Sequence, residues 1–157
     1  CYDVGRIRHI HFWNFWAADG DQVVGPLQNW IAEHGASLRL ARTDWEVVED
    51  VFSWGYGRGL VLAESEFGAC NGQFTNINFD AVDVGVEVAA TQQPGCLFSN
   101  LNLANAGSWC VDAANCHQVG IRCSNCSVAG GGGGTGLVVR GMSLWGEFKQ
   151  AVQVRVK

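Results

Sequence analysis

The feature of this sequence that most constrains its fold is a six-residue phrase that recurs along the chain. Each copy has an apolar residue, any residue, a small polar or turn residue, an apolar residue, any residue and a final apolar residue. The copies lie at residues 7–12, 74–79, 98–103, 123–128 and 139–144, with a degraded copy at 48–53. The copies starting at 74, 98 and 123 follow one another at a nearly constant interval. A period of this kind indicates stacked supersecondary units, and strand-like units predict a β-solenoid.

The turn inside the phrase predicts a ladder of asparagine side chains. The two residues between the apolar flanks, Ser-Asn or Thr-Asn, must turn the chain sharply, and asparagine tolerates the left-handed backbone region that such a turn needs. After the turn, apolar and polar residues alternate, which is the signature of a half-buried strand. With coils stacked about 4.8 Å apart, we expect Asn76, Asn100 and Asn125 to hydrogen-bond from coil to coil.

The phrase also carries a resemblance to a known family. Residues 120–128, Gly-Ile-Arg-Cys-Ser-Asn-Cys-Ser-Val, look like the second strand, asparagine turn and third strand of a coil in the right-handed parallel β-helices of the pectate-lyase superfamily. Residues 3–13 resemble bacterial and phage members of that group, which includes pectate lyases, polygalacturonases and phage tailspike-like proteins. The resemblance covers most of residues 1–156. It implies an all-β fold, a right-handed parallel β-helix (solenoid) of about five to six coils.

The rest of the chain fits one domain over residues 1–157. A loop and helix excursion is expected at 13–36, with a short helix at 26–34 because Pro26 stands in its first turn and Gly35 follows its end. Leu27, Trp30, Ile31 and His34 share one face of that helix. Residues 44–54 fit both helical and strand spacing, and the coil count favours strand, turn and strand. Further strands are expected at 38–40, 60–62, 84–88, 109–112 and 152–156.

Charge and hydropathy exclude two classes of partner. The formal net charge of −5 argues against a nucleic-acid or anionic-membrane surface. No apolar run reaches the length of a membrane span. The chain opens inside a coil phrase, so we expect it to be a fragment of a longer protein. An uncapped coil end exposes unpaired backbone groups, and this predicts a homo-oligomer.

The seven cysteines do not require a metal or redox site. Cys123 and Cys126 have the CxxC spacing of zinc and redox motifs. Both nevertheless occupy the apolar slots of the phrase, as Phe74 and Ile77 do in another copy. We therefore expect Cys123 and Cys126 to be buried, reduced and metal-free. No cofactor is expected.

In the resembling family, the outer face of the first strand of each coil lines a polysaccharide groove. Alternation points Arg39, Glu87, Asp112, Gln153 and Arg155 outward from that strand here. Glu87 and Asp112 are separated by the same interval as Asn100 and Asn125, which predicts the same register on adjacent coils. A carboxyl pair at about 5 Å is what a retaining glycosidase uses, as acid and nucleophile. Two solvated outward acids are the alternative.

The candidate catalytic residues are therefore Glu87 and Asp112, and the candidate substrate-binding residues are Arg39, Arg155 and Trp54. The sequence has no adjacent Asp-Asp, no Gly-His-Gly and no Arg-x-x-Pro-x-x-Arg motif of the resembling enzymes. Two functions remain open. One is a glycoside hydrolase or lyase acting on a polysaccharide, and the other is a non-catalytic, glycan-binding or structural oligomeric β-helix.

Overall fold

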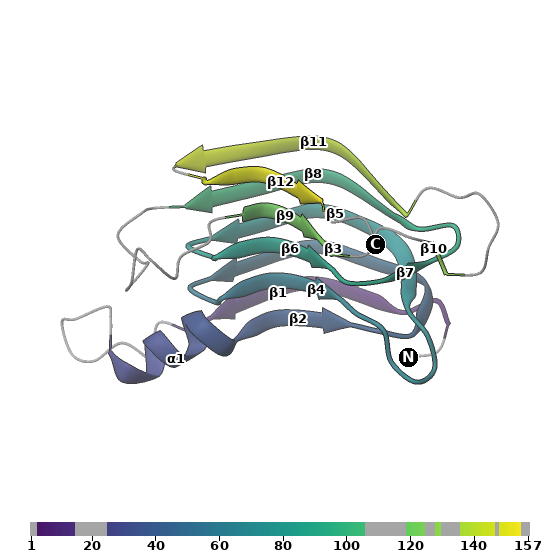
Figure 1. Cartoon of the computed structure of the whole chain (residues 1–157), viewed down its shortest axis with the longest axis horizontal. Coiled ribbons are helices and arrows are strands. Elements are labelled where there is room, and N and C mark those ends of the chain that lie inside the picture. Colours follow the sequence, from purple (N-terminus) through teal and green to yellow (C-terminus); the bar gives the residue numbers. More distant parts are fainter. Residues whose placement is uncertain are drawn as a thin grey trace.

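The computed structural model describes residues 3–14, 25–105, 119–124, 128–129, 136–146 and 148–154. These residues form parallel strands and one helix (Figure 1). The elements in chain order are β1 (Arg6–Trp13), α1 (Pro26–His34), β2 (Ala36–Leu40), β3 (Thr43–Trp54), β4 (Arg58–Leu62), β5 (Cys70–Asp80), β6 (Val84–Val88), β7 (Thr91–Gln92), β8 (Cys96–Asn105), β9 (Val119–Cys123), β10 (Val128–Ala129), β11 (Leu137–Gly146) and β12 (Gln150–Val154).

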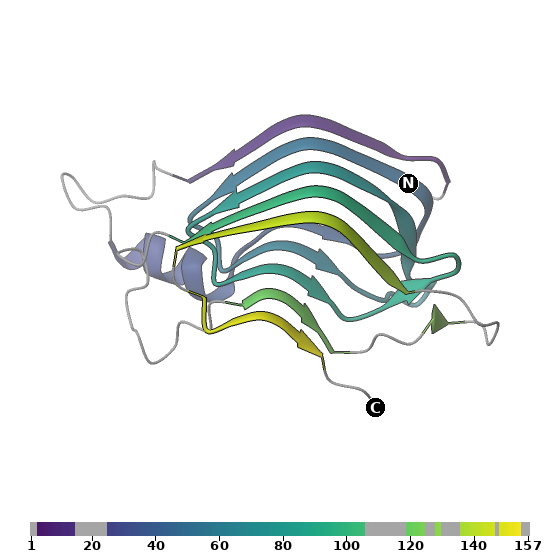
Figure 2. The same ribbon diagram turned by 90° about the horizontal axis from the view of Figure 1, so that it is seen from above.

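The strands assemble into two open five-stranded sheets that face one another (Figure 2). The long sheet has the order β1-β3-β5-β8-β11, and the short sheet has the order β12-β9-β6-β4-β2. From β2 onward the chain alternates between them, and we call one passage through both sheets a circuit. Each strand lies beside the strand of the same sheet from the previous circuit. All pairs in both sheets are parallel. The predicted all-β, parallel architecture is confirmed, and β7 with β10 adds a two-stranded parallel pair.

The apolar slots of the phrase stack on one another inside the protein. Phe74 lies opposite Phe98, and Ile77 lies opposite Leu101 in the next strand. The rings of Phe74 and Phe98 stack with centroids 4.5 Å apart, and both side chains are fully buried. Burial of one such side chain stabilises the fold by roughly 1.5–3 kcal/mol. The core therefore lies between the two sheets and is built from residues one circuit apart.

The long sheet bends where each of its strands passes through the left-handed region (Figure 2). The residues at the bend have φ of 54° at His9, 54° at Asp50, 54° at Asn76, 58° at Asn100 and 69° at Gly141. Asn100 Nδ2 donates to Asn76 Oδ1 at 2.8 Å, and Asn76 Nδ2 donates to Asp50 Oδ1 at 2.9 Å. The predicted ladder is confirmed for Asn76 and Asn100.

The third predicted rung is wrong. Asn100 is followed at the bend by Gly141, since Arg140 pairs with Ser99 and Met142 with Leu101. Residues 123–128 are not a copy of the phrase in the long sheet, because Cys123 ends β9 in the short sheet, opposite Val88. Asn125 lies outside the described residues. A uniform period fails here because the circuit that brings β11 onto β8 is much longer than the circuit that brings β8 onto β5.

The cysteine prediction is half right. Cys123 is buried, as its apolar slot predicts, but it is disulfide-bonded rather than reduced. Its disulfide partner and Cys126 lie outside the described residues. An apolar slot predicts burial and not oxidation state, since a disulfide sulfur suits the core as well as a thiol does. Cys70 and Cys96 are free and buried.

The helix and the strand expected at residues 44–54 lie where the sequence predicts them. α1 spans Pro26–His34 with proline at its start, and it leads into β2 (Figure 1). Its buried residues are Gln28 and Ile31, whereas Leu27, Trp30 and His34 are exposed, so Ile31 is the one residue of the predicted face that is buried. β3 is a strand with a bend at Asp50. No helix among the described residues is long and apolar enough to cross a bilayer.

Candidate functional site

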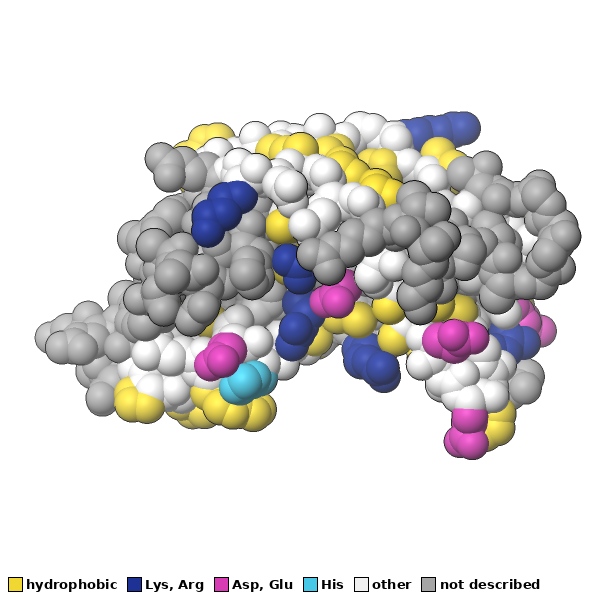
Figure 3. Space-filling view, in the orientation of Figure 1, with side chains coloured by type: hydrophobic (Ala, Val, Ile, Leu, Met, Phe, Trp, Pro, Cys, Tyr) yellow, Lys and Arg dark blue, Asp and Glu magenta, His cyan; other side chains and the backbone are white. Residues whose placement is uncertain are grey.

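Two of the predicted site residues lie on the outer face of the short sheet. Arg39 on β2 pairs with Val61 on β4, and Val61 pairs with Glu87 on β6. Arg39 and Glu87 are thus two strand spacings apart, about 10 Å. Figure 3 views this face, where Lys and Arg side chains gather over the middle of the short sheet.

The position beside Glu87 on the next strand is held by Arg122, and the predicted adjacency of Glu87 and Asp112 is therefore wrong. Asp112 lies outside the described residues, as does Arg155. The prediction assumed circuits of constant length, but the circuit from Glu87 to Arg122 is longer than the repeat of the phrase. Whether either acid is catalytic stays a prediction.

The charged side chains of this face contact one another and the nearby backbone. Arg58 Nε lies 4.0 Å from Glu87 Oε2, and an Arg58 guanidinium nitrogen donates to the His34 carbonyl at 2.9 Å. Arg122 Nε donates to Gln153 Oε1 at 3.0 Å. Over the described residues, the outer face of the short sheet is thus an ionic surface with more cations than carboxylates.

Trp54 lies away from this surface. It ends β3 in the long sheet, where its side chain is 7% exposed. Its ring stacks against Trp13 of β1, with centroids 5.5 Å apart and planes 24° apart. The structure therefore brings Arg39 and Glu87 to one face and places Trp54 on the other sheet.

The outer face of the long sheet carries a groove of about 240 Å³ beside Trp54. It crosses four strands, β3, β5, β8 and β11, and so spans about 14 Å at the usual strand spacing. The lining residues are Phe52, Asn78, Phe79, Asp80, Asn102, Leu103, Ala104, Ser143 and Trp145.

Differences in side-chain size along two outward rows create this groove. One row runs Phe52, Asn78, Asn102 and Ser143 in register, and the other runs Trp54, Asp80, Ala104 and Trp145. Each row has a bulky ring at its β3 end and smaller side chains on the central strands. At the β11 end of the second row the side chain is bulky again, because Trp145 stands there with 67% of its surface exposed. The groove is thus a depression between two aromatic walls.

The floor of the groove has a fixed pattern of amide hydrogen bonds. Asn102 Nδ2 donates to Asn78 Oδ1 at 2.8 Å, and Asn78 Nδ2 donates to the Asn76 carbonyl at 3.0 Å. This second amide ladder runs parallel to the ladder at the bend. The bonds fix the orientation of both side chains, so that their donor and acceptor atoms keep defined positions.

Asp80 is an acid of unusual environment in the middle of the groove. Its Oδ1 atom is shielded from solvent and has no hydrogen-bond partner. Burial raises the pKa of Asp80 above its ordinary value of 3.8, and the backbone N–H of Ala81 opposes this in part. A raised pKa together with an unpartnered oxygen in a depression is a pattern found at binding and catalytic sites.

The β3 wall is itself supported by rings from β1. Phe52 stacks against Trp13 at 5.9 Å and meets the His11 ring edge-on at 5.7 Å. Trp13 also stacks on Trp54, so four rings, including that of His11, pack together at this side of the sheet. Rings held in this way present rigid apolar surface at small conformational cost.

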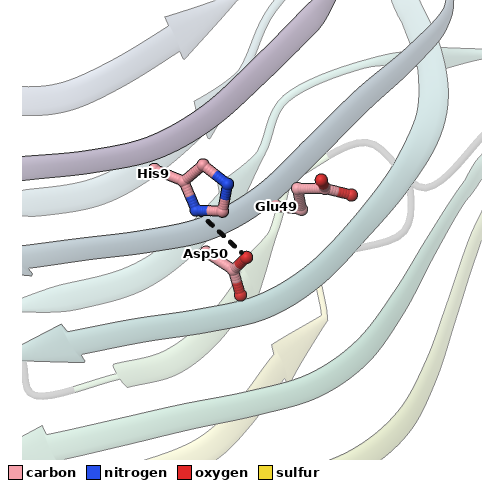
Figure 4. Close-up of side chains that lie close together, drawn as sticks. All are labelled: His9, Glu49 and Asp50. Carbon is pink, nitrogen blue, oxygen red and sulfur yellow. Dashed lines mark ion pairs between the residues drawn. The ribbon is translucent and has the colours of Figure 1, made fainter.

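A separate cluster at the bend, His9, Glu49 and Asp50, has ligand atoms within 4.8 Å of one another (Figure 4). Its donor set could hold a metal ion. Each carboxylate already has protein partners, however. Arg8 Nε lies 2.8 Å from Glu49, while His9 Nδ1 lies 3.3 Å from Asp50, which also accepts from Asn76. The cluster is the β1–β3 end of the bend ladder.

The prediction from sequence missed the groove residues Asn78, Asp80 and Asn102. One signal was present, because the freely variable fifth position of the phrase is asparagine in two successive copies, at 78 and 102. The repeated amide at an outward position was the available indication of a polar floor.

Comparison with known proteins gives no relative for this chain. No family model matches it, and no curated protein or solved structure shows a significant match.

Proposed function

We propose that this chain is a right-handed parallel β-helix of the pectate-lyase type that binds a glycan chain along the groove of the long sheet. The observation that carries this proposal is the groove itself, in which Phe52 and Trp145 flank a floor of Asn78, Asp80 and Asn102. The fold part is supported by the parallel pairing, by the alternation of the chain between two sheets, and by the ladder of Asn76 and Asn100.

The chemistry of the groove suits a sugar. A pyranose ring has an apolar face of C–H groups, which packs on an aromatic ring, and a rim of hydroxyls that both donate and accept hydrogen bonds. Amide side chains also donate and accept, so Asn78 and Asn102 match those hydroxyls. A depression with apolar walls and a few oriented polar groups is the usual form of a ligand site. Because the groove crosses strands from β3 to β11, an extended chain of sugars fits better than a single one.

Binding without catalysis is the form of the proposal that the groove supports best. A glycosidase needs two carboxyl groups, about 5–5.5 Å apart in retaining enzymes and about 6.5–9.5 Å apart in inverting ones. Among the described lining residues, Asp80 is the single carboxylic acid.

A polysaccharide hydrolase or lyase is the second candidate. The raised pKa of Asp80 favours it, because a general acid must hold its proton near the working pH. Release of reducing sugar across a polysaccharide panel tests this candidate, and an ultraviolet signal from a new double bond distinguishes a lyase from a hydrolase.

We also propose that the chain associates with copies of itself. β12 is an edge strand whose Val152 and Val154 are 51% and 55% exposed, although they stack in register on the buried Ile121 and Cys123. An exposed strand edge with apolar side chains favours contact with another chain. Light scattering that gives a stable monomer near the chain mass of 16.9 kDa at micromolar concentration contradicts this part.

The test of glycan binding uses two tryptophans of similar exposure. Trp145→Ala removes a groove wall, whereas Trp30→Ala removes an exposed ring on α1 that does not line the groove. In calorimetric titrations with a panel of oligosaccharides, we expect Trp145→Ala to weaken binding at least about tenfold, or about 1.4 kcal/mol. Trp30→Ala should bind as the unaltered protein does. Absence of binding to every glycan in the panel contradicts the proposal.

A further inference from the structure

We infer that the groove selects uncharged glycans and that Asp80 is the specificity-determining residue, its carboxylate accepting hydrogen bonds from the hydroxyls of a neutral sugar. This inference rests on the proposed glycan binding and names the substrate class of that same groove. It makes Asp80 a ligand contact rather than a structural residue.

The charge of the groove lining opposes the binding of acidic sugars. Asp80 is the sole charged side chain among the described residues that line the groove. A uronic acid or a sulfated sugar bound there brings its anion close to the Asp80 carboxylate, and none of the described lining residues is a cation that could offset the repulsion. Arg39, Arg58 and Arg122 are in strands of the other sheet, and the arginines of the long sheet, Arg6, Arg8 and Arg140, do not line the groove. Like charges brought together out of water oppose binding strongly, so the groove discriminates against acidic sugars.

The Asp80 carboxylate can accept more hydrogen bonds than the protein gives it. An ionised carboxylate only accepts hydrogen bonds, and it has room for several. Asp80 is half-buried and lines the groove, so part of its carboxylate is accessible to a bound sugar, while its shielded Oδ1 accepts no hydrogen bond from the protein. Hydroxyl groups of a neutral sugar are donors of the right kind, and hydrogen bonds to an ionised acceptor are about twice as strong as those between neutral groups.

The position of Asp80 in the sheet suits contact with a sugar that is stacked on Trp145. It lies on β5, the central strand of the long sheet, and its neighbours in register are Trp54 on β3 and Ala104 on β8. The small side chain of Ala104 leaves space beside the carboxylate on the side toward Trp145. A sugar ring stacked on Trp145 can thus direct its hydroxyls along the row toward Asp80. Neither neighbour in register is titratable, and no charged group contributes to the raised pKa of Asp80.

The experiment compares neutral and uronic-acid oligosaccharides of equal length, titrated calorimetrically into three proteins. These are the unaltered chain, Asp80→Asn, and Glu64→Gln, which makes the same change of charge at an exposed residue outside the groove. Asparagine keeps the shape of Asp80, and thermal unfolding checks that both variants fold.

The unaltered chain should bind at least one neutral glycan and bind uronic-acid chains at least about tenfold more weakly. Asp80→Asn should lose about tenfold in affinity for the neutral glycan and reduce the discrimination against uronic acids, whereas Glu64→Gln should change neither. Affinity of the unaltered chain for the neutral glycan should also fall as the pH falls through the raised pKa of Asp80, and Asp80→Asn should lack this dependence.

The outcomes separate the two claims. If no glycan of either class binds, the proposed function fails. If the unaltered chain binds uronic-acid chains as tightly as neutral ones, or if Asp80→Asn binds both classes as the unaltered chain does, glycan binding stands and the inference about Asp80 is overturned. Neutral-glycan affinity that is independent of pH in the unaltered chain also overturns it.

Discussion

The outer faces of the two sheets belong to the same circuits of the chain, yet the part of the long sheet that carries the groove differs chemically from the outer face of the short sheet. The ionic groups of the long sheet, such as the pair of Arg8 and Glu49, do not line the groove. The long sheet presents rings, amides and one carboxylic acid around a groove. The short sheet presents Arg39, Glu87, Arg122 and Gln153 in one register row, with Arg58 beside them. Both faces cover the same core and have the same parallel pairing. The difference shows that the fold depends on the inward residues, while the outward residues decide what each face can bind.

Removing a shared inward side chain should affect both faces at once and give the largest effect. Phe98→Ala deletes a buried ring that stacks on Phe74, so we expect a loss of about 3–5 kcal/mol in the free energy of unfolding. Urea denaturation measures it. The matched control is Ser99→Ala, a half-buried neighbour on the same strand, for which a change within about 0.5 kcal/mol is expected. Equal effects of the two variants contradict the assignment of stability to the inward row.

The bend ladder belongs to the long sheet alone, and Asn76 is its middle rung. Asn76→Ala removes the bonds to Asp50 and Asn100 and leaves a residue with a Cβ atom at φ 54°, so we expect a loss of about 2–3 kcal/mol. Asn76→Gly loses the same bonds but tolerates that φ, and a smaller loss is expected. Thermal unfolding of both variants separates the two causes. A glycine variant as unstable as the alanine variant shows that the hydrogen bonds alone matter.

Asp80 should reduce stability at neutral pH while it serves the groove. Because burial raises its pKa, the folded chain binds this proton more tightly than the unfolded chain does. The stabilising contribution of Asp80 is therefore complete below its ordinary pKa of 3.8 and is lost as the pH rises through the raised value. We expect Asp80→Asn to melt at a higher temperature than the unaltered chain at neutral pH, with the advantage shrinking on acidification. An advantage that is constant with pH argues against the raised pKa.

The smallest effect is expected on the short sheet. Glu87→Gln removes a partly exposed contact with Arg58 at 4.0 Å, so the free energy of unfolding should change by no more than about 0.5 kcal/mol. Glycan affinity should not change, because Glu87 and the groove belong to different sheets. If the protein is found to cleave a polysaccharide and Glu87→Gln abolishes cleavage, the functional face is that of the short sheet.

The repeating features of the fold could be predicted from the sequence. The inward slots of the phrase, such as Phe74 and Phe98, recur because each must fill the same layer of core, and Asn76 and Asn100 recur because each must make the same turn. These local requirements are legible in one sequence. The helix at Pro26–His34 was legible for the same reason, since its ends carry their own signals.

The remainder depends on circuits of unequal length. Assuming a fixed period placed Asp112 beside Glu87 and Asn125 above Asn100, where the structure has Arg122 and Gly141. The groove was also out of reach, because it depends on the relative sizes of outward side chains from four strands. The residues that line it are separated by circuits of different lengths, as Asn102 and Ser143 illustrate. The period of the sequence predicts which strands stack, but it does not predict where the outer surface has a groove.

Like stacks on like across β5 and β8, where Phe74, Ile77 and Asn78 lie opposite Phe98, Leu101 and Asn102. In genetic terms, the unit of the coding sequence that can be inserted or deleted with least harm is therefore the segment that encodes one complete layer. Duplication or deletion of one complete layer joins compatible surfaces, whereas loss of a single residue within a strand turns its later side chains to the wrong face. Such a chain can change length in large steps more readily than in small ones.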